Sequence, residues 1–303
     1  MVHVSDSDLS TYRDSGYLIL RQALDSEALE STRALLTRAV DRQANKLKDE
    51  GKISNLHEDE PFHIRLARLS ESGKITSGMF DLTQALDDPD LFSLVRHPGI
   101  LDAVGSLLGP EIAWTSSYVT RPNLPSNRTQ GFPWHQDSQY YGDPTSHLHI
   151  VSLWAPLVDV DEPNGCLYLM PGSQKWGLRD GKRDGTGVFR SFEDIEKRGT
   201  PLKVPMSPGD LLLFSNLTYH CSKLNRTDTV RWAVDMRFVA PPDSRSLTAE
   251  EREGYATLDK HYRTPPITVR SEQPENEAGL AQLKEFIARR NDRRAKKKVG
   301  ASA

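Results

Sequence analysis

The residues best suited to chemistry in this chain are two histidines and one carboxylate. His135 and Asp137 are separated by a single residue, and His220 lies far downstream. Two histidines and a carboxylate form the ligand set that binds Fe(II) on one face and leaves the opposite face open. On an extended strand alternate side chains share a face, so His135 and Asp137 can both reach one metal ion. We therefore expect a catalytic metal site made of His135, Asp137 and His220.

Two predicted strands must position the rest of this site. The polar residues that share a face are Thr218, His220 and Ser222 in the strand 217–222, and Arg231, Asp235 and Arg237 in the strand 230–239. Arg231 suits the distal carboxylate of a dicarboxylic co-substrate, because a guanidinium forms bidentate hydrogen bonds with a carboxylate. Asp235 and Arg237 either contact a polar substrate or pair with each other.

The surrounding sequence predicts a β-rich body with helical flanks. Short apolar runs between residues 112 and 239 are separated by Gly and Pro turns, which is typical of an antiparallel sandwich or jelly roll. Upstream, we expect a strand at 17–20, a helix capped by Asp25 and one helix from Asp90 to Leu108; the segment 46–72 stays unassigned. Near the end, an apolar stripe at 280–287 predicts a helix, and a basic tail follows it.

Composition limits the classes of function. The chain has 303 residues, a formal net charge of −3 and two cysteines, Cys166 and Cys221. Its isoelectric point near 6.3 argues against a dedicated nucleic-acid binder. We expect no disulfide framework, no secretory signal and no membrane span. The sequence thus predicts a cytoplasmic protein with a small-molecule substrate and neither a nucleic-acid nor a membrane partner, and it leaves the oligomeric state open.

Several blocks of sequence carry a family resemblance. They are WHQDS at 134–138, WAPL at 154–157, NGCLYLMPGS at 164–173, PGD at 208–210, HCSKLNR at 220–226, and Arg231. Together they resemble the phytanoyl-CoA dioxygenase family of Fe(II)/2-oxoglutarate oxygenases, from Gly16 to about Phe238. The spacing of the blocks is far more specific than a single His-x-Asp pair.

The resemblance implies a mainly β fold, a double-stranded β-helix (jelly roll, cupin-like) with flanking helices. It implies one domain over 1–303, with its core at about 112–240, a helical flank at 1–110 and an extension at 241–303. Fe(II) would be bound by His135, Asp137 and His220. 2-Oxoglutarate would be bound by Arg231 and Ser222 in a pocket lined by Gln136 and Trp154; Ser117 and Arg121 are further candidates.

The implied reaction is hydroxylation of a C–H bond by O₂, with release of succinate and CO₂. Asp137 opposes halogenation, because relatives that halogenate have a small residue there; desaturation and cyclisation stay open. Two other hypotheses remain: a metal-dependent enzyme that does not use 2-oxoglutarate, and a catalytically silent binding protein.

Three further groups of residues have weaker interpretations. We expect the pair His147 and His149 to be solvent-facing strand residues. We expect the substrate to approach near Gln139, Tyr140 and Tyr141. The arginines that would suit an anionic substrate are Arg65, Arg68, Arg121 and Arg128.

Overall fold

The computed structural model describes residues 2–74, 89–120, 122–125, 131–185, 187–262 and 265–272, with positions 285 and 288. Its largest sheet has six antiparallel strands in the order β1-β8-β3-β10-β2-β11. Their bounds are Tyr17–Leu20, Leu211–Ser215, Val151–Pro156, Ala233–Val239, Ile112–Val119 and Ile267–Arg270. Leu213 pairs with Leu18 on one side and Leu153 on the other. Buried apolar side chains on neighbouring strands thus fix the register.

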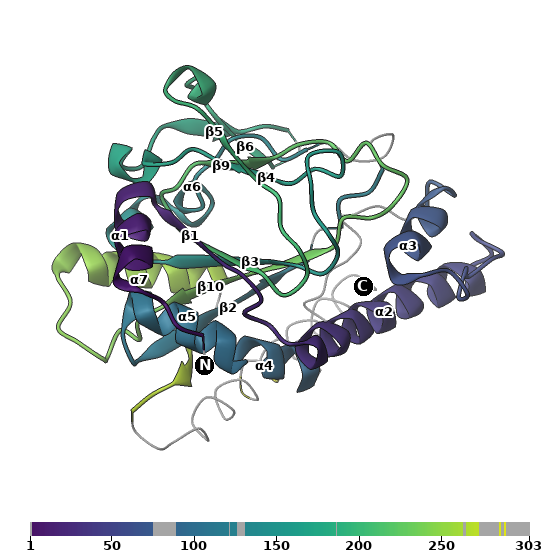
Figure 1. Ribbon diagram of the computed structural model, residues 1–303, viewed down its shortest axis with the longest axis horizontal. Helices are drawn as coiled ribbons and strands as arrows, with labels where there is room; N and C mark the ends of the chain where they lie inside the picture. Colours follow the sequence, from purple (N-terminus) through teal and green to yellow (C-terminus); the bar gives the residue numbers. More distant parts are fainter. Residues whose placement is uncertain are drawn as a thin grey trace, which may run out of the picture.

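A second sheet faces the first across the interior (Figure 1). It has the order β7-β4-β9, with bounds Leu202–Val204, Leu167–Leu169 and His220–Ser222. A bridge between His135 and His220 extends it by one segment. The hairpin of β5 (Gly181–Arg183) and β6 (Phe189–Ser191) lies beside it. Two facing antiparallel sheets with this connectivity form a double-stranded β-helix, as predicted.

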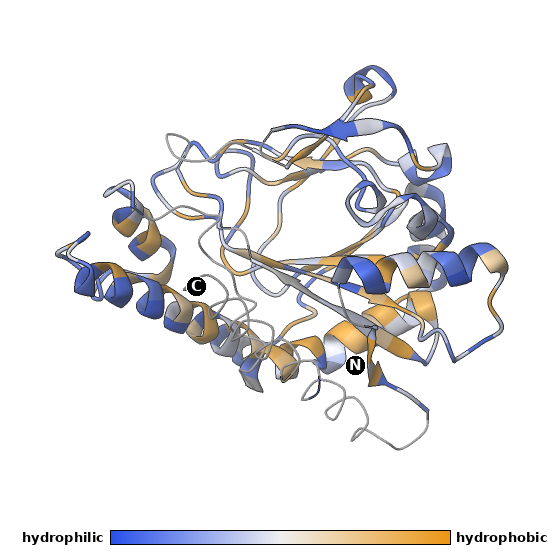
Figure 2. Cartoon of the chain, turned by 180° about the vertical axis from the view of Figure 1, so that it is seen from behind, coloured by the Kyte–Doolittle hydropathy of each residue, from blue (hydrophilic) through white to orange (hydrophobic). Residues whose placement is uncertain are grey.

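Helices lie around the two sheets (Figure 1). They are α1 (Asp6–Ser15), α2 (Ser26–Asp49), α3 (Phe62–Ser70), α4 (Pro89–Val95), α5 (Pro98–Leu108), α6 (Ser138–Tyr141) and α7 (Ala249–Tyr262); single 3₁₀ turns are η3 (Asp143–His147), η4 (Ser173–Trp176) and η5 (Ile195–Lys197). The side chain of Asp25 accepts a hydrogen bond from the Ala28 amide and so caps α2. Figure 2 shows α5 largely hydrophobic, whereas the far end of α2 is largely hydrophilic. Burial of an apolar helix face against the sheet is the expected reason for this packing.

Some local predictions are confirmed and others are wrong. The strand at 17–20 and the helix after Asp25 are present. The single helix predicted from Asp90 to Leu108 is two helices, because Pro98 begins α5 and the His97 side chain caps it through the Gly99 amide. The unassigned segment 46–72 contains the end of α2 and the whole of α3.

The other corrections concern the histidine pair and the C-terminal extension. His147 ends η3 and His149 precedes β3, so neither lies on the strand predicted for them, but both are exposed as expected. The extension contributes α7 and also an edge strand, β11, which the sequence did not reveal. The predicted apolar stripe at 280–287 and the basic tail fall outside the described residues, apart from position 285.

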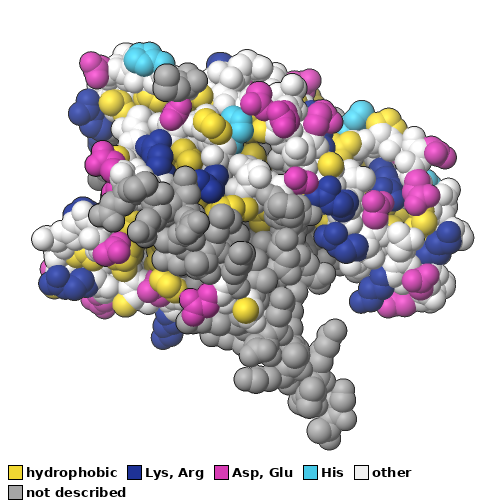
Figure 3. All heavy atoms as spheres, turned by 90° about the horizontal axis from the view of Figure 1, so that it is seen from below, with side chains coloured by type: hydrophobic (Ala, Val, Ile, Leu, Met, Phe, Trp, Pro, Cys, Tyr) yellow, Lys and Arg dark blue, Asp and Glu magenta, His cyan; other side chains and the backbone are white. Residues whose placement is uncertain are grey.

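The surface carries mixed charge. On the face drawn in Figure 3, basic and acidic side chains of the described residues are interspersed, in keeping with the small net charge. Among the described residues, no helix is both long enough and apolar enough to cross a membrane.

The central position of Leu213 gives a test of the sheet. It is fully buried, so Leu213→Ala is expected to lower the free energy of unfolding by about 2–5 kcal/mol, through lost burial and the cavity left behind. Phe192→Ala is the control: Phe192 is 66% exposed, and its loss is expected to change stability by less than about 0.5 kcal/mol. Urea unfolding measures both; equal effects would contradict the register described here.

Candidate metal centre

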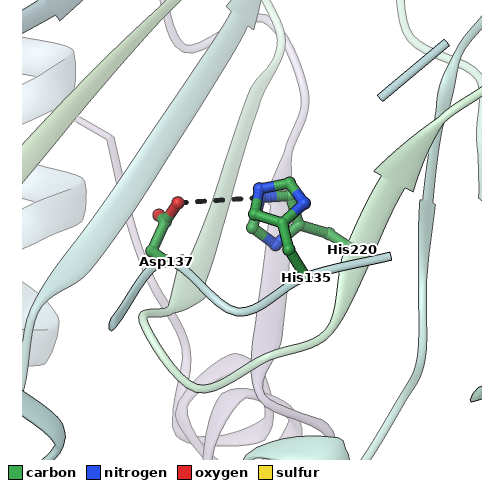
Figure 4. Close-up of side chains that lie close together, drawn as sticks. All are labelled: His135, Asp137 and His220. Atoms are coloured by element: carbon green, nitrogen blue, oxygen red, sulfur yellow. Dashed lines mark ion pairs between the residues drawn. The ribbon is translucent and has the colours of Figure 1, made fainter. Parts of the chain in front are cut away.

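The structure brings His135, Asp137 and His220 together. Each offers one ligand atom, and the three atoms lie within 4.8 Å of one another. All three residues are buried, with exposures of 6%, 3% and 6%. Figure 4 shows the two imidazoles next to each other, with the Asp137 carboxylate facing them. This convergence of a nitrogen–nitrogen–oxygen set is what a single metal ion requires.

Backbone pairing places the two histidines side by side. The amide of His135 donates to the carbonyl of His220, and the amide of His220 donates to the carbonyl of His135, both at 3.0 Å. Such a reciprocal pair holds two residues directly opposite each other. The ring centroids are 4.1 Å apart as a result.

Asp137 reaches the same point, but not by the strand alternation that was expected from the sequence. Its backbone has helical angles, φ −58° and ψ −39°, and it directly precedes α6. The chain therefore leaves the extended conformation after His135, so strand alternation alone does not bring Asp137 onto the shared face. The turn into α6 brings the Asp137 carboxylate to the histidines.

Each imidazole is oriented by a carbonyl two residues earlier. Nδ1 of His135 lies 2.8 Å from the Pro133 carbonyl, and Nδ1 of His220 lies 3.0 Å from the Thr218 carbonyl. A carbonyl accepts only, so Nδ1 carries the proton and Nε2 keeps its lone pair. Burial lowers the pKa of both histidines, and for His135 the neighbouring His220 lowers it further. Both rings are thus neutral at physiological pH, as metal ligands must be.

The carboxylate of Asp137 is held by the large sheet. Ser152 on β3 donates to its Oδ2. Arg237 on β10 donates from Nε to Oδ2 and from Nη2 to Oδ1, each at 3.1 Å. Burial alone would raise the pKa of Asp137, but the charge and hydrogen bonds of Arg237 act against it, and the pKa lies below its usual value. The ligand is therefore ionised.

Arg231 is a buried cation with no carboxylate partner among the described residues. Only 6% of it is exposed, and its Nε has no hydrogen-bond partner. Among the described residues no carboxylate pairs with its guanidinium, which lies 5.5 Å from the centre of the Trp154 ring. Burial lowers the pKa of Arg231 to about 10. An isolated buried charge is costly, so this position calls for an anion.

Ser222 and Gln136 have different surroundings. The hydroxyl oxygen of Ser222 accepts a hydrogen bond from the Phe132 amide, which leaves its proton free to donate elsewhere. The Gln136 amide is fully engaged: its nitrogen donates to the carbonyls of Gly177 and Leu217, and its oxygen accepts from the Arg179 amide. Gln136 thus joins its own segment to those at 177–179 and 217, and its role in lining the co-substrate pocket stays a prediction.

Aromatic rings form a wall beside His135. The centroid of Phe132 lies 4.8 Å from the His135 ring, and that of Tyr140 lies 5.3 Å from it. Phe189 on the β5–β6 hairpin stacks edge-on with Tyr140 at 5.8 Å. Tyr141 contacts the rings of His261 and Tyr262 of α7. Gln139, by contrast, is a buried structural residue that binds backbone groups.

The remaining candidates lie elsewhere or cannot be placed. Arg65 pairs with Asp41, and Arg68 pairs with Glu60 and Glu71, so both serve the α2–α3 region. Arg121, Arg128 and the side chain of Ser117 fall outside the described residues. Cys166 and Cys221 are free and buried.

Sequence reasoning missed the contacts of Ser152, Phe132 and Arg237 with the triad. Only the alternation of Arg231, Asp235 and Arg237 along one strand gave a signal for Arg237. The Asp235–Arg237 pair expected as one alternative is present, at 2.9 Å.

Comparison with known proteins settles the family. The family model described as Phytanoyl-CoA dioxygenase (PhyH) matches residues 12–233. The chain belongs to this family. It is 27% identical over 249 residues to a probable phytanoyl-CoA dioxygenase of Caenorhabditis elegans, covering 79% of this chain and 76% of the relative. It is 25% identical to the peroxisomal phytanoyl-CoA dioxygenase of Homo sapiens, covering 76% of this chain and 66% of the relative.

A solved structure confirms the fold of this PhyH-family chain. The epimerase SnoN, in complex with Fe³⁺, alpha ketoglutarate and nogalamycin RO, superposes with a TM-score of 0.53 at 18% identity. The alignment covers 78% of this chain and 83% of the other. At this level of identity the likeness establishes the shared jelly-roll fold and nothing finer.

The unpaired charge of Arg231 predicts a gain in stability on its removal. The pKa of Arg231 is lowered on folding, so burying its protonated form costs stability below about pH 10, and the cost declines as pH rises above that value. Arg231→Met is therefore expected to raise the free energy of unfolding at pH 7 by about 1–3 kcal/mol. The matched control is Arg237→Met, which leaves Asp137 buried without its partner and is expected to lower stability. Urea unfolding measures both variants. A lower free energy of unfolding for Arg231→Met than for the wild type would contradict an uncompensated charge on Arg231.

Proposed function

We propose that the protein is an Fe(II)- and 2-oxoglutarate-dependent dioxygenase that hydroxylates a C–H bond of a small molecule. One observation carries the proposal: a buried, neutral-imidazole and carboxylate triad shares its interior with an unpaired guanidinium. The triad fits a metal ion, and the guanidinium fits the far carboxylate of a dicarboxylic co-substrate. Membership of the PhyH family supports both assignments.

In this proposal each residue has one task. His135 and His220 bind iron through Nε2, because their Nδ1 protons are committed to backbone carbonyls. Arg231 binds the distal carboxylate of 2-oxoglutarate, with Ser222 as a second donor and Trp154 as an apolar wall. Iron and 2-oxoglutarate together activate O₂ for C–H cleavage, with succinate and CO₂ as co-products. The protein supplies orientation and excludes water.

The carboxylate of Asp137 limits the reaction outcome. It occupies a ligand position that a halide would need, and Arg237 and Ser152 hold it there. Hydroxylation is the default outcome. An epimerase has a similar fold, which supports the view that other reaction outcomes depend on how the substrate is oriented in the site.

The charges of the interior favour joint binding of metal and co-substrate. Arg231 and Arg237 are balanced by Asp137 and Asp235, so these four groups sum to zero. A divalent cation alone would add two positive charges to a buried site. A doubly charged 2-oxoglutarate cancels them, and charge balance in a low-dielectric interior is strongly favoured.

The spectroscopic test uses anaerobic Fe(II). Addition of 2-oxoglutarate to the Fe(II)-loaded protein is expected to produce a weak visible charge-transfer band. His135→Ala and Asp137→Ala are expected to abolish it by removing a ligand. Arg231→Gln is expected to weaken 2-oxoglutarate binding about tenfold to a hundredfold, since a charged hydrogen bond contributes about 1.5–3 kcal/mol.

The same titrations separate the alternative functions. Metal binding that is unaffected by 2-oxoglutarate and by Arg231→Gln would favour a metal-dependent enzyme of another class. A normal band without substrate-stimulated succinate release, across a broad panel of metabolites, would favour a silent binding protein.

Charge balance predicts coupling between the two ligands. Saturating 2-oxoglutarate is expected to raise the affinity for Mn(II), an inert substitute for Fe(II), by about tenfold or more, and Mn(II) must raise the affinity for 2-oxoglutarate by the same factor. Isothermal titration calorimetry measures both directions. A monocarboxylate such as acetate is the control, and equal coupling by acetate and 2-oxoglutarate would contradict a role for Arg231.

A further inference from the structure

We infer that Arg237 and Ser152 form a clamp that fixes Asp137 as a one-oxygen ligand presented through Oδ1. This inference rests on the proposed metal site and adds two positioning residues to it. Neither residue would itself bind the metal; both act by orienting the carboxylate of Asp137.

The two oxygens of Asp137 have unequal surroundings. Oδ2 accepts from the Ser152 hydroxyl and from Nε of Arg237, so both of its lone pairs are used. Oδ1 accepts a single hydrogen bond, from Nη2 of Arg237. Oδ1 is also the oxygen that lies 3.8 Å from Nε2 of His220. Only Oδ1 therefore combines a spare lone pair with a position facing the histidines.

The clamp is built into the large sheet. Arg237 on β10 and Ser152 on β3 are directly paired across the sheet, so their side chains leave the same face next to each other. Both reach across the interior to Asp137, which follows the bridge that extends the small sheet. Their hydrogen bonds join the two sheets at the ligand itself.

A second carboxylate attracts the arginine. Nη1 of Arg237 lies 2.9 Å from Oδ2 of Asp235 on the same face of β10 and forms an ion pair with it, although Nη1 donates no hydrogen bond to any described residue. The plane of the guanidinium relative to Asp137 is set by its two hydrogen bonds from Nε and Nη2. Arg237 is buried, with 7% exposed, and water does not compete for these hydrogen bonds.

The test measures metal affinity and metal geometry, not turnover. Co(II) is titrated into metal-free protein and followed by its d–d absorption. Arg237→Gln removes the fork, and it is expected to weaken Co(II) binding about 10–100-fold, the usual effect of losing a group that orients a ligand. Arg237→Lys keeps the charge without the fork and is expected to fall between Arg237→Gln and the wild type.

Spectra distinguish the clamp from a general structural role. With the clamp removed, Asp137 is free to bind through both oxygens, which raises the coordination number and weakens the absorption per bound ion. A merely loosened protein would lose affinity with an unchanged spectrum. That result, or wild-type affinity in folded Arg237→Gln, overturns the proposal.

Two controls keep the outcomes separate. Arg190 on β6 is an exposed arginine that forms an ion pair with Asp184. Arg190→Gln removes this pair and is expected to leave Co(II) binding unchanged. Ser152→Ala removes one donor to Asp137 with little change in volume, so it serves as the test if Arg237→Gln does not fold. It is expected to weaken Co(II) binding severalfold. An unaltered affinity and an unaltered spectrum would overturn the clamp. A wild-type protein that binds no Co(II) refutes the metal site itself, whereas tight binding by the wild type and all variants refutes the clamp alone.

Discussion

Two backbone hydrogen bonds between His135 and His220 are the constraint on which the site depends. They fix two residues that are far apart in the chain at the level of the main chain, so the imidazoles leave the same face side by side. Each ring is then oriented by the carbonyl two residues before it, Pro133 in one segment and Thr218 in the other. Both rings are thus oriented by the same kind of local hydrogen bond to the backbone, and neither needs a side-chain partner for this. The metal-facing nitrogens are therefore set by strand pairing before any ligand arrives.

The third ligand is governed by electrostatics instead of strand pairing. Asp137 is buried and ionised, a state that is stable only because Arg237 and Ser152 neutralise and solvate it. Arg231, in the same interior, receives no such compensation. Among the described residues Arg237 has carboxylate partners and Arg231 has none, although the two arginines lie only six residues apart in the chain. That asymmetry is the observation behind the co-substrate role proposed for Arg231.

The sequence was sufficient to predict the convergence of the triad and the jelly roll, because ligand type, spacing and turn residues are local properties. It failed where the outcome depends on which segments meet. The same alternation that indicated Arg231 also placed Arg237 on the inner face, but nothing local says that Arg237 meets Asp137 from the opposite sheet. Gln136 is a second case: the family resemblance implied a pocket role for it, but nothing local indicated its three backbone partners, which come from remote segments. The break at Pro98 was readable in principle, since proline starts α5.

The two halves of the cavity are built from different kinds of structure, and this bears on how one fold serves several reactions. The metal and co-substrate groups come from paired strands and from residues locked by backbone contacts. The wall beside His135 comes instead from Phe132 in a loop, Tyr140 in α6 and Phe189 in a hairpin. Loops and short helices change shape with little cost to the core, whereas paired strands do not. In the proposed enzyme, substrate choice would therefore be set by elements that can vary independently of the metal-binding residues.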